Sequence, residues 1–599
     1  MAEKYFSRRN IDFLLNEVFE VNSLTRFPYY ADHNDLTFKM TLDTAQKIAD
    51  NMMYPVFKEM DRQAPVWEDG KVKVHPAVKE FMKEQGKGGW INVDKPYEVG
   101  GQQLPSIIKL MAGLIFSAAN YSLSVYTALT MGAANLIFTF GTQEMKDQYL
   151  PGMYSGEWQG TMALTEPDVG SSLGDLTTQA EDTGKGYYLI KGKKIFISAG
   201  NSDAVDNVIH MMLARIKGAP AGVKGISLFI VPENRYREDG GLEYNDVACG
   251  GIEHKMGYRG SPICQLSMGE EGDCRGWLIG EAGKGLAHMF TMMNEERLNV
   301  GMGATGKVTA AYYASLEYAR QRLQGRRLME KDPNTRMVPI IEHPDIKRLL
   351  LFQRAVAEGS LSLLAQLFMY DELAKFGDEK EKYELLLDFL VPIAKTYPSE
   401  MGILTCSAAI QILGGYGYCG DFPVEQYYRD IRIDPIHEGT TGIQGMDMLG
   451  RKVVMKQGKA FNLFIEEVSQ TIDQALIYDE LSGMAKQLQE NLERLKVVAG
   501  SLLEWAMQGK TEEFMADSVL FLEFIGIIAI AWQWLKQAVV CCDKLKNMPA
   551  DSNINFYMGK IYTARYFFEY ELSKTVSLAV RLTSKYKLTA EMPASCFEE

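Results

Sequence analysis

Several signatures that would identify a chemistry directly are missing from this 599-residue chain. Its eight cysteines include no CxxC pair, and its seven histidines include no HExxH motif. Scattered cysteines predict reduced thiols in a cytosol-like compartment and disfavour both a disulfide framework and a zinc site. The missing HExxH motif also disfavours a metalloprotease-like centre. We therefore expect no bound metal.

A basic surface and a targeting segment are missing too. The chain has 63 Lys and Arg against 77 Asp and Glu, which gives a net charge of −14. Proteins that bind nucleic acids need a basic face, so this balance disfavours a nucleic-acid partner. The opening residues, MAEKYFSRRNIDFLLNEVFE, mix acidic and basic side chains and contain no apolar stretch typical of a secretory signal or transit peptide. We expect a cytoplasmic protein.

Long unbroken apolar runs are also scarce. The most apolar stretch, SVLFLEFIGIIAIAWQWLKQAVVCC at 518–542, is interrupted by Glu523, Gln533 and Lys536. A helix that spans a membrane needs ~20 nearly unbroken apolar residues. We expect a helix buried in a bundle, and no transmembrane segment. A peripheral membrane contact is the less favoured alternative.

The patterns that are present predict a mainly helical protein with a central β domain. Apolar residues recur at helical spacing up to about residue 158 and again after residue 285. Between them, short β-branched and aromatic runs are separated by Gly, Asn, Asp and Pro, as in a β domain. The expected domains are an N-terminal helical domain (1–158), a β domain (159–283), a helical bundle (284–456) and an additional C-terminal helical domain (457–599).

One motif is misleading. GMGATG at 301–306 fits the GxGxxG dinucleotide pattern, which has physical force only where a strand precedes it and a helix follows. Here the flanking segments on both sides have helical periodicity. We expect small residues that let two helices approach closely, and no nicotinamide-binding fold.

Four further segments suggest a site, although each has an ordinary alternative. In MALTEPDVGSSLGDL (162–176), backbone amides and hydroxyls at Thr165, Ser171 and Ser172 suit a polar ligand edge, but the segment also reads as a plain loop. Phe196 in KKIFISAGNSD is either a core aromatic or a platform for a flat ring. Arg297 and Arg322 are each ordinary helix-surface residues when taken alone.

The fourth segment is the most specific. QILGGYGYCGDFPVEQYYRDIRIDPIHEGTTGIQ, at 411–444, is a long run of glycines and aromatics that ends beside one isolated acid, Glu438. Ile436 precedes this glutamate, small turn-forming residues follow it, and Ile443 lies close behind. A carboxylate in an apolar, tightly turned environment is costly unless it has a task.

Taken in order, these segments resemble the acyl-CoA dehydrogenase flavoprotein family over roughly residues 1–456. The resemblance rests on the TEPxxGS loop, a later RxxxG, QxLGGxG and a final EGT. TEPDVGSSLGDL, HKMGYRGSP and the extra C-terminal helices are similar to a large bacterial subgroup of 3-methylthiopropanoyl-CoA dehydrogenase-like enzymes. The resemblance implies an N-terminal helical domain, a β-barrel-like middle domain and a C-terminal four-helix bundle, plus the added helical domain.

The resemblance also implies FAD as the cofactor, held between domains and across a homodimer interface. Arg322 would bind its diphosphate, and Gln411, Gly414 and Gly415 would contact its adenine half from the other subunit. Phe196 and Ser198 stand where the family often has Trp and Thr. The other expected flavin contacts are Met162, Leu164, Thr165, Gly170, Ser171, Thr440 and Gln444.

For the substrate, the resemblance implies an acyl-CoA thioester. Ser171, Arg297 and Gly439 fall on its expected contacts, as does Asn294, where an aspartate is frequent. Glu438 would be the catalytic base that removes the α-proton, and burial should raise its pKa toward ~6–7. A backbone amide of the turn would stabilise the charge on the thioester oxygen. The β-hydrogen would leave as hydride to the flavin, giving a trans-2-enoyl-CoA.

Three interpretations remain open at this stage. The first is an acyl-CoA dehydrogenase that passes electrons to an electron-transfer flavoprotein. The second is an acyl-CoA oxidase that uses oxygen; the chain ends in ASCFEE, without an SKL-like peroxisomal signal, which disfavours it. The third is a flavin-free scaffold, which the complete motifs disfavour. His437, where Tyr is frequent, is either a hydrogen-bonding neighbour of the site or a packing residue.

Overall fold

The computed structural model describes residues 4–237, 240–547 and 553–598, and it divides into two compact units. We call Asp35–Asn299 the sheet unit, and Met1–Asn34 together with Val300–Glu599 the bundle unit. Each unit is described by itself. The three predicted boundaries between the four domains stay predictions, because each unit combines parts of more than one predicted domain.

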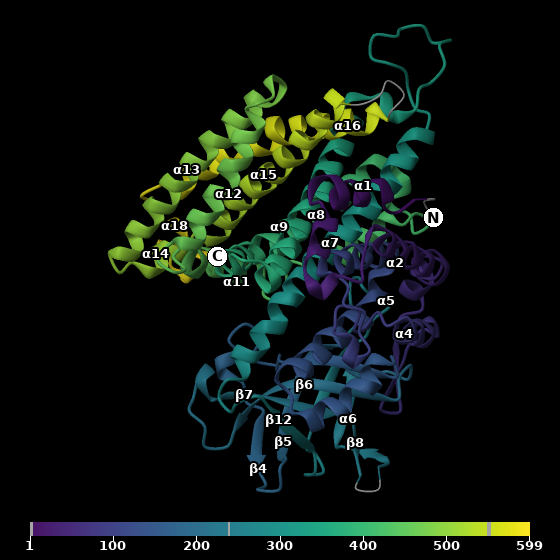
Figure 1. Cartoon of the computed structure of the whole chain (residues 1–599), viewed down its shortest axis with the longest axis vertical. Helices are drawn as coiled ribbons and strands as arrows, with labels where there is room; N and C mark the ends of the chain where they lie inside the picture. Colours follow the sequence, from purple (N-terminus) through teal and green to yellow (C-terminus); the bar gives the residue numbers. More distant parts are fainter. Residues whose placement is uncertain (1–3, 238–239, 548–552, 599) are drawn as a thin grey trace. The chain divides into compact units, whose positions relative to one another are not determined.

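The sheet unit contains all the strands of the described chain, five complete α-helices and the first part of a sixth, α7 (Gly285–Gln321) (Figure 1). Its helices are α2 (Asp35–Ile48), α3 (Phe57–Arg62), α4 (Ala77–Lys87), α5 (Ser106–Phe140) and α6 (Gln143–Tyr154). Its strands are β1 (Val66–Glu68), β2 (Lys71–Lys73), β3 (Trp158–Ala163), β4 (Gln179–Asp182), β5 (Tyr188–Ser198), β6 (Asn207–Ile216), β7 (Ile226–Pro232), β8 (Asn234–Tyr236), β9 (Leu242–Tyr244), β10 (Val247–Ile252), β11 (Ile263–Met268) and β12 (Arg275–Ile279).

The main sheet has the strand order β10-β11-β5-β12-β7-β6-β3, and β4 pairs with both β5 and β6. Strands β5, β12, β7, β6 and β4 therefore form a closed ring of paired strands, which agrees with the predicted barrel-like domain. Strand β3 runs parallel to β6, and its residues from Trp158 to Ala163 are all buried. Burial of its first eight residues explains why β6, NVIHMMLARI, reads as a mostly apolar run instead of an alternating one.

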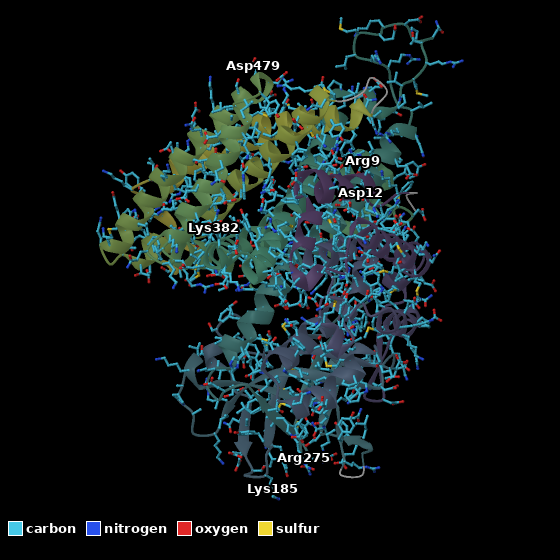
Figure 2. All side chains as sticks on the ribbon, in the orientation of Figure 1. Arg9, Asp12, Lys185, Arg275, Lys382 and Asp479 are labelled. Carbon is cyan, nitrogen blue, oxygen red and sulfur yellow. The ribbon has the colours of Figure 1, made fainter. Side chains whose placement is uncertain are left out.

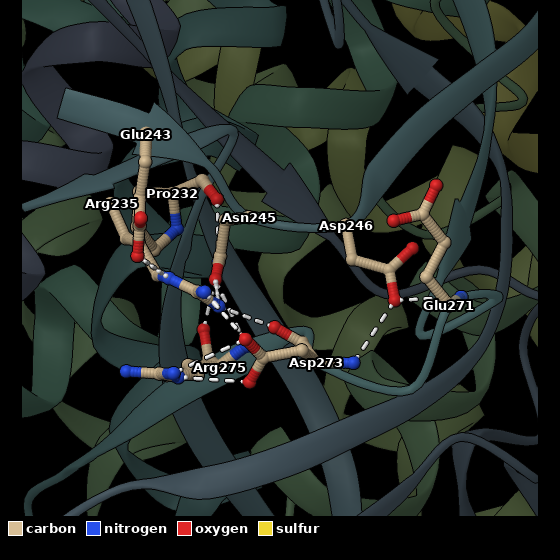
Figure 3. Close-up of polar contacts among 8 residues, drawn as sticks. All are labelled: Pro232, Arg235, Glu243, Asn245, Asp246, Glu271, Asp273 and Arg275. Atoms are coloured by element: carbon tan, nitrogen blue, oxygen red, sulfur yellow. Dashed lines mark hydrogen bonds and ion pairs between the residues drawn. The ribbon is translucent and has the colours of Figure 1, made fainter.

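A polar cluster holds the β8–β9 hairpin against the loop that precedes β12 (Figure 3). Buried Arg235 donates to Glu243 at 2.7 Å and to the carboxylate of Asp273 at 2.5 Å. Arg275 donates to the same carboxylate, and these hydrogen bonds, with the charges of the two arginines, lower the pKa of Asp273. These residues satisfy one another, so the cluster has a structural role.

The described part of the bundle unit consists of helices joined by turns and by the loop 322–339, and it contains no named strand. It contains α1 (Arg8–Phe13), most of α7 (Gly285–Gln321), α8 (Pro344–Phe376), α9 (Lys380–Leu413), α10 (Val424–Ile431), α11 (Thr441–Asp447), α12 (Lys459–Ala475), α13 (Ser482–Met507), α14 (Thr511–Met515), α15 (Ser518–Asn547), α16 (Ile554–Tyr566), α17 (Thr575–Leu582) and α18 (Leu588–Glu591). The helices α12, α13 and α15 pack side by side (Figure 1). This layout confirms the predicted mainly helical protein with a central β domain.

Two stretches of the described chain are long and apolar enough to span a membrane by length and composition. They are α5 and the segment Thr511–Asn547, which contains α15, and 56% and 72% of their most apolar windows are buried. In α15, Trp534 donates to the backbone of Ala355 at 3.0 Å, and Gln533 accepts from Ser362 at 2.7 Å. The predicted buried helix at 518–542 is therefore confirmed.

The GMGATG motif lies inside α7, as predicted. A Cβ on Gly301 would stand 2.2 Å from the carbonyl oxygen of Ala394, so only glycine permits this approach of α7 to α9. Arg9, labelled in Figure 2, lies in α1 near the start of the bundle unit. It pairs with Glu17 at 2.7 Å and donates to Tyr557 of α16 at 2.9 Å. The ring of Phe13 meets that of Phe556 at 5.4 Å, so the first helix of the chain packs on one of the last.

Candidate active site

Glu438 lies on the turn that joins α10 to α11 in the bundle unit, and its backbone has a positive φ of 51°. A non-glycine residue rarely adopts this left-handed conformation, which costs of order 1–3 kcal/mol and occurs preferentially at functional sites. The next residue, Gly439, also has a positive φ, of 87°. The turn therefore orients Glu438 in a way that neither a helix nor a strand would allow.

Gln444, in the first turn of α11, stabilises this conformation through hydrogen bonds from its side chain. Its amide nitrogen lies 3.3 Å from the carbonyl oxygens of both Glu438 and Gly439. The positive φ of Gly439 explains the glycine, and a Cβ there would also stand 2.6 Å from the same nitrogen. Thr440 caps α11 by accepting from the backbone of Ile443 at 3.3 Å. Gln444 is fully buried and supports the turn, and its predicted flavin contact stays a prediction.

A second support comes from a buried ion pair in front of the turn. Asp434 is fully buried and pairs with Lys307 of α7 at 2.9 Å. Its backbone carbonyl accepts from Lys395 of α9 at 2.6 Å. Two cations on long helices thus fix the backbone four residues before Glu438. His437 also faces this centre, with its Nε2 atom 3.4 Å from the Asp434 carboxylate.

In the sheet unit, a β-bulge turns Phe196 outward. Leu266 of β11 pairs with Lys194, but Cys264 pairs with Ile197, so Ile195 and Phe196 both lie opposite Gln265. Such a bulge re-aims side chains and is common beside active sites. Phe196 has a φ of 60° and is 60% exposed. The core interpretation of this aromatic was therefore wrong, and the platform interpretation is compatible with its exposure.

The predicted TEP loop lies beside this bulge, held there by a buried ion pair. The ammonium of Lys194 on β5 lies 2.9 Å from the carboxylate of Glu166 and 2.9 Å from the carbonyl oxygen of Leu164. The backbone of Ile195 donates to the carbonyl of Thr165 at 2.9 Å. Strand β5 therefore fixes the backbone of the residues expected to meet the flavin edge.

Further donors surround the carboxylate of Glu166. The backbone N–H of Thr177 donates to it at 2.6 Å, and that of Thr178 at 3.0 Å. Burial would raise the pKa of Glu166, but the Lys194 ammonium and these hydrogen bonds lower it to about 2. Glu166 is therefore charged at neutral pH and ties three backbone segments together.

The remaining predicted residues are distributed over both units. In the sheet unit, Met162 is buried in β3, Gly170 and Ser171 are exposed, Ser198 is half-buried at the end of β5, and buried Arg297 lies 3.3 Å from Asn294 on α7. In the bundle unit, Arg322 is exposed just after α7, and Gln411, Gly414 and Gly415 are exposed at the end of α9. The structure thus gathers Leu164, Thr165 and Phe196 at one place, and Glu438, Gly439, Thr440 and Gln444 at another.

The sequence motifs did not predict two buried ion pairs that support the candidate site: Glu166 with Lys194, and Asp434 with Lys307. The sequence contains a signal for one of them. In the strand 188–198, alternation places Lys194 on the same face as buried Ile190, where a lysine needs a partner. For Asp434 and Lys307, 127 residues apart, the sequence gives no comparable signal. Among the described residues, no group of three or more His, Cys, Asp or Glu side chains could hold a metal ion.

Comparisons with known proteins identify the family of this chain. Four family models match the chain in order: Acyl-CoA dehydrogenase N-terminal domain (37–157), middle domain (161–270) and C-terminal domain (283–453), then Acetyl-CoA dehydrogenase C-terminal like (464–593). A butyryl-CoA dehydrogenase of Syntrophomonas wolfei is 34% identical over 583 residues, 94% of each chain. A 3-methylmercaptopropionyl-CoA dehydrogenase of Ruegeria pomeroyi is 34% identical over 555 residues, 91% of this chain and 92% of the relative.

Solved structures agree on the fold. An acyl-CoA dehydrogenase from Bacillus anthracis, complexed with FAD, aligns with a TM-score of 0.74 at 21% identity and covers 96% of this chain and 93% of its own. Caenorhabditis elegans ACDH-11, in complex with C11-CoA, aligns with a TM-score of 0.75 at 20% identity and covers 92% and 90%. The expected family, fold and enzyme class are therefore confirmed: the chain belongs to the acyl-CoA dehydrogenase family of oxidoreductases.

Proposed function

We propose that the protein catalyses the FAD-dependent α,β-dehydrogenation of a saturated acyl-CoA thioester to a trans-2-enoyl-CoA and passes the electrons to an electron-transfer flavoprotein. The observation that carries the proposal is the left-handed conformation of Glu438, held by Gln444 at its carbonyl. Strain of this kind is maintained where it serves a site. The relatives reported above are named dehydrogenases, which favours this function over an oxidase.

The residues present are compatible with FAD. A flat ring system needs an exposed aromatic face, which Phe196 offers, and a nucleotide needs backbone that it can approach closely. Nothing lies within 4 Å of a Cβ built on Gly170, Gly414 or Gly415, so these positions leave such space. We propose that Arg322 binds the diphosphate and that Gln411, Gly414 and Gly415 receive the adenine half. The residues proposed to line the flavin are Met162, Leu164, Thr165, Gly170, Ser171, Phe196, Ser198, Thr440 and Gln444.

When bound, FAD supplies the hydride acceptor. The chain's own residues bind and polarise the substrate. Glu438 takes the proton from the α-carbon, and a backbone N–H of its turn donates to the thioester oxygen, where negative charge develops. Ser171, Asn294 and Arg297 orient the CoA portion. Gln444 and the Asp434–Lys307 pair keep the carboxylate of Glu438 directed at one position, which lowers the cost of reaching the transition state.

The experiment that tests this function is the variant Glu438→Gln, which keeps the shape of the side chain and removes the base. Folding, flavin content and acyl-CoA binding should survive, while flavin reduction by substrate should slow by ~10²–10⁴-fold or more. Glu425→Gln, which changes a carboxylate of α10 that pairs with Arg429, is the matched control and should keep the wild-type rate. A Glu438→Gln enzyme that reduces flavin within about tenfold of wild type would place the base elsewhere.

A substrate panel decides the acyl group and the acceptor. The relatives suggest starting with butyryl-CoA and 3-methylmercaptopropionyl-CoA, each assayed with ferrocenium and separately with oxygen. A dehydrogenase should turn over rapidly with ferrocenium, and its reduced form should persist in air. Hydrogen peroxide production at the ferrocenium rate would instead identify an oxidase. We propose a cytoplasmic location on the support of the eight free thiols.

A further inference from the structure

The helix that follows the base turn is pressed directly against the C-terminal segment, by which we mean helices α12 to α18. Gly445 of α11 faces the first turn of α15, and a Cβ on it would stand 2.9 Å from backbone atoms of Ser518 and Val519. An ordinary carbon contact needs about 3.5–4.0 Å, so an added methyl group would force the two helices apart by roughly 0.5–1 Å. The backbone of Ser518 has no flexible end that could yield.

The contact at Gly445 is linked to the turn that carries Glu438 by the preceding residue of α11. Gln444, the residue before Gly445, is fully buried and holds the carbonyl groups of Glu438 and Gly439. A displacement of α11 at Gly445 therefore moves the hydrogen bonds that keep Glu438 in its left-handed conformation. Close-packed interiors transmit small shifts of this kind because they contain little free space.

The first turn of α15 is itself anchored from the far end of the chain. Asp517, just before α15, is buried and pairs with Lys587 at 3.0 Å and with Arg581 at 3.0 Å. Lys587 is fully buried, and its ammonium also lies 3.3 Å from the carbonyl oxygen of Leu582. The backbone of Phe521 donates to the carbonyl of Asp517 at 3.0 Å, so the ion pair is attached to the helix start. A continuous path of close contacts thus runs from Lys587 to the base turn.

We propose that the C-terminal segment braces the catalytic base, and that Gly445 and Lys587 are positioning residues that act on Glu438 through Ser518 and Gln444. The proposal rests on the proposed role of Glu438. It assigns a catalytic purpose to the added helices. They set the position of α11 through the contact of Gly445 with Ser518, while the ion pair of Asp434 with Lys307 holds the chain before the turn.

The test uses the full-length flavin-loaded enzyme and three substitutions. Gly445→Ala should slow flavin reduction by about 10–100-fold, because misplacement by ~1 Å can cost that much, while binding of the 2-enoyl-CoA product stays within about twofold. Lys587→Met should give the same split with a smaller loss, of about 2–30-fold. Gly500→Ala is the matched control: a Cβ at this position of α13 meets nothing within 4 Å, so reduction and binding should stay unchanged. A merely structural role would lower flavin content and product affinity together with the rate.

The outcomes separate the brace from the base. If Glu438→Gln is inactive and Gly445→Ala reduces flavin at the wild-type rate, the brace is wrong and the base stands. If Glu438→Gln remains active, the proposed function itself fails. Should Gly445→Ala not fold, Lys587→Met decides: a selective loss of the reduction rate supports the brace, and a wild-type rate overturns it.

Discussion

The Nε2 atom of His437 lies 3.4 Å from the carboxylate of Asp434, which itself lies 2.9 Å from the ammonium of Lys307. The residue beside the proposed base thus faces a carboxylate that is shielded from solvent and already paired. Nε2 of His437 is buried and has no hydrogen-bond partner among the described residues, so the ring is a close polar neighbour of Asp434 and not a hydrogen-bonded one. The turn thus has two separate supports. One is the ion pair of Asp434 with Lys307, and the other is the pair of hydrogen bonds from the Gln444 side chain to the backbone carbonyls of the turn.

Asp434→Asn should destabilise the bundle unit. The substitution leaves the charge of Lys307 buried without its counter-ion, a change that typically costs ~3–5 kcal/mol. The thermal unfolding midpoint should fall by several degrees, with partial loss of flavin reduction in the protein that remains folded. Asp421→Asn, at an exposed aspartate before α10, is the control and should leave the midpoint unchanged. Equal midpoints for the two variants would show that the buried pair contributes little.

His437→Phe should cost far less than loss of the base. The ring volume is largely kept and only the polar contact with Asp434 is removed, so we expect flavin reduction within about tenfold of wild type, against ~10²–10⁴-fold for Glu438→Gln. Stopped-flow reduction across pH 6–9 measures both variants. A rate as low as that of Glu438→Gln would mean that His437 takes part in the proton transfer.

Glu166→Gln should remove a pH-dependent part of the stability. The folded pKa of Glu166 lies below its ordinary value of 4.5, at about 2, so its contribution is complete above about pH 4.5 and is lost as the pH falls through about 2. The difference in unfolding midpoint between wild type and variant should therefore be largest near pH 6 and shrink below pH 4.5. A difference that stays constant down to pH 2 would contradict the assignment.

Phe196→Ala should weaken flavin binding without weakening the fold. The side chain is mostly exposed, so its removal should change the free energy of unfolding by only ~0.5 kcal/mol. Loss of an aromatic face against a flat ring is worth ~0.5–1.5 kcal/mol, which corresponds to roughly 2–12-fold weaker flavin binding. Flavin fluorescence on dilution measures the release. Phe597→Ala, at an exposed aromatic near the end of the chain, should release flavin like wild type.

The flavin-loaded enzyme should be a homodimer. Gln411, Gly414 and Gly415 are exposed in the single chain, and we propose that they receive the adenine half of a cofactor bound to the other subunit. Light scattering should therefore give twice the mass of the chain. Gly415→Glu, which adds a side chain where nothing lies within 4 Å, should fold normally and lose flavin. A stable monomer with full flavin occupancy would contradict the arrangement.

Local pattern predicted the elements of this fold well. The helical reading of GMGATG depended on the flanking periodicity and was right, and the polar interruptions in 518–542 correctly indicated a buried helix. Both signals lie within a few turns of the residues concerned. Phe196 shows a limit of prediction from local pattern. Strict alternation along β5 places it on the same face as Lys194, but the bulge directs its side chain to the surface. One inserted residue reverses a strand face, and no propensity marks it.

The supports of the candidate site were harder to predict than its motif. Glu438 stands out in the sequence because its neighbours are apolar and small, but Gln444 looks like any other polar helix residue. The helix that carries it approaches α15 closely through Gly445 and Ser518, which are far apart in sequence. The same holds for Lys307 and Asp434. The role of a residue that acts through a partner distant in sequence can be inferred only from the structure, which brings the two together.

The packing of α1 on α16 has a consequence for the order in which the protein is made. Arg9 and its partner Tyr557 are 548 residues apart, so at 5–20 residues per second the first helix waits roughly 30–110 s on the ribosome before its partner is synthesised. During that time Ile11, Phe13 and Leu14, all buried in the finished structure, lack their final packing. The sheet unit, by contrast, is continuous in sequence and can fold while translation proceeds. In a nascent chain stalled before residue 553, protease should therefore cleave within residues 4–14 and spare residues 35–299.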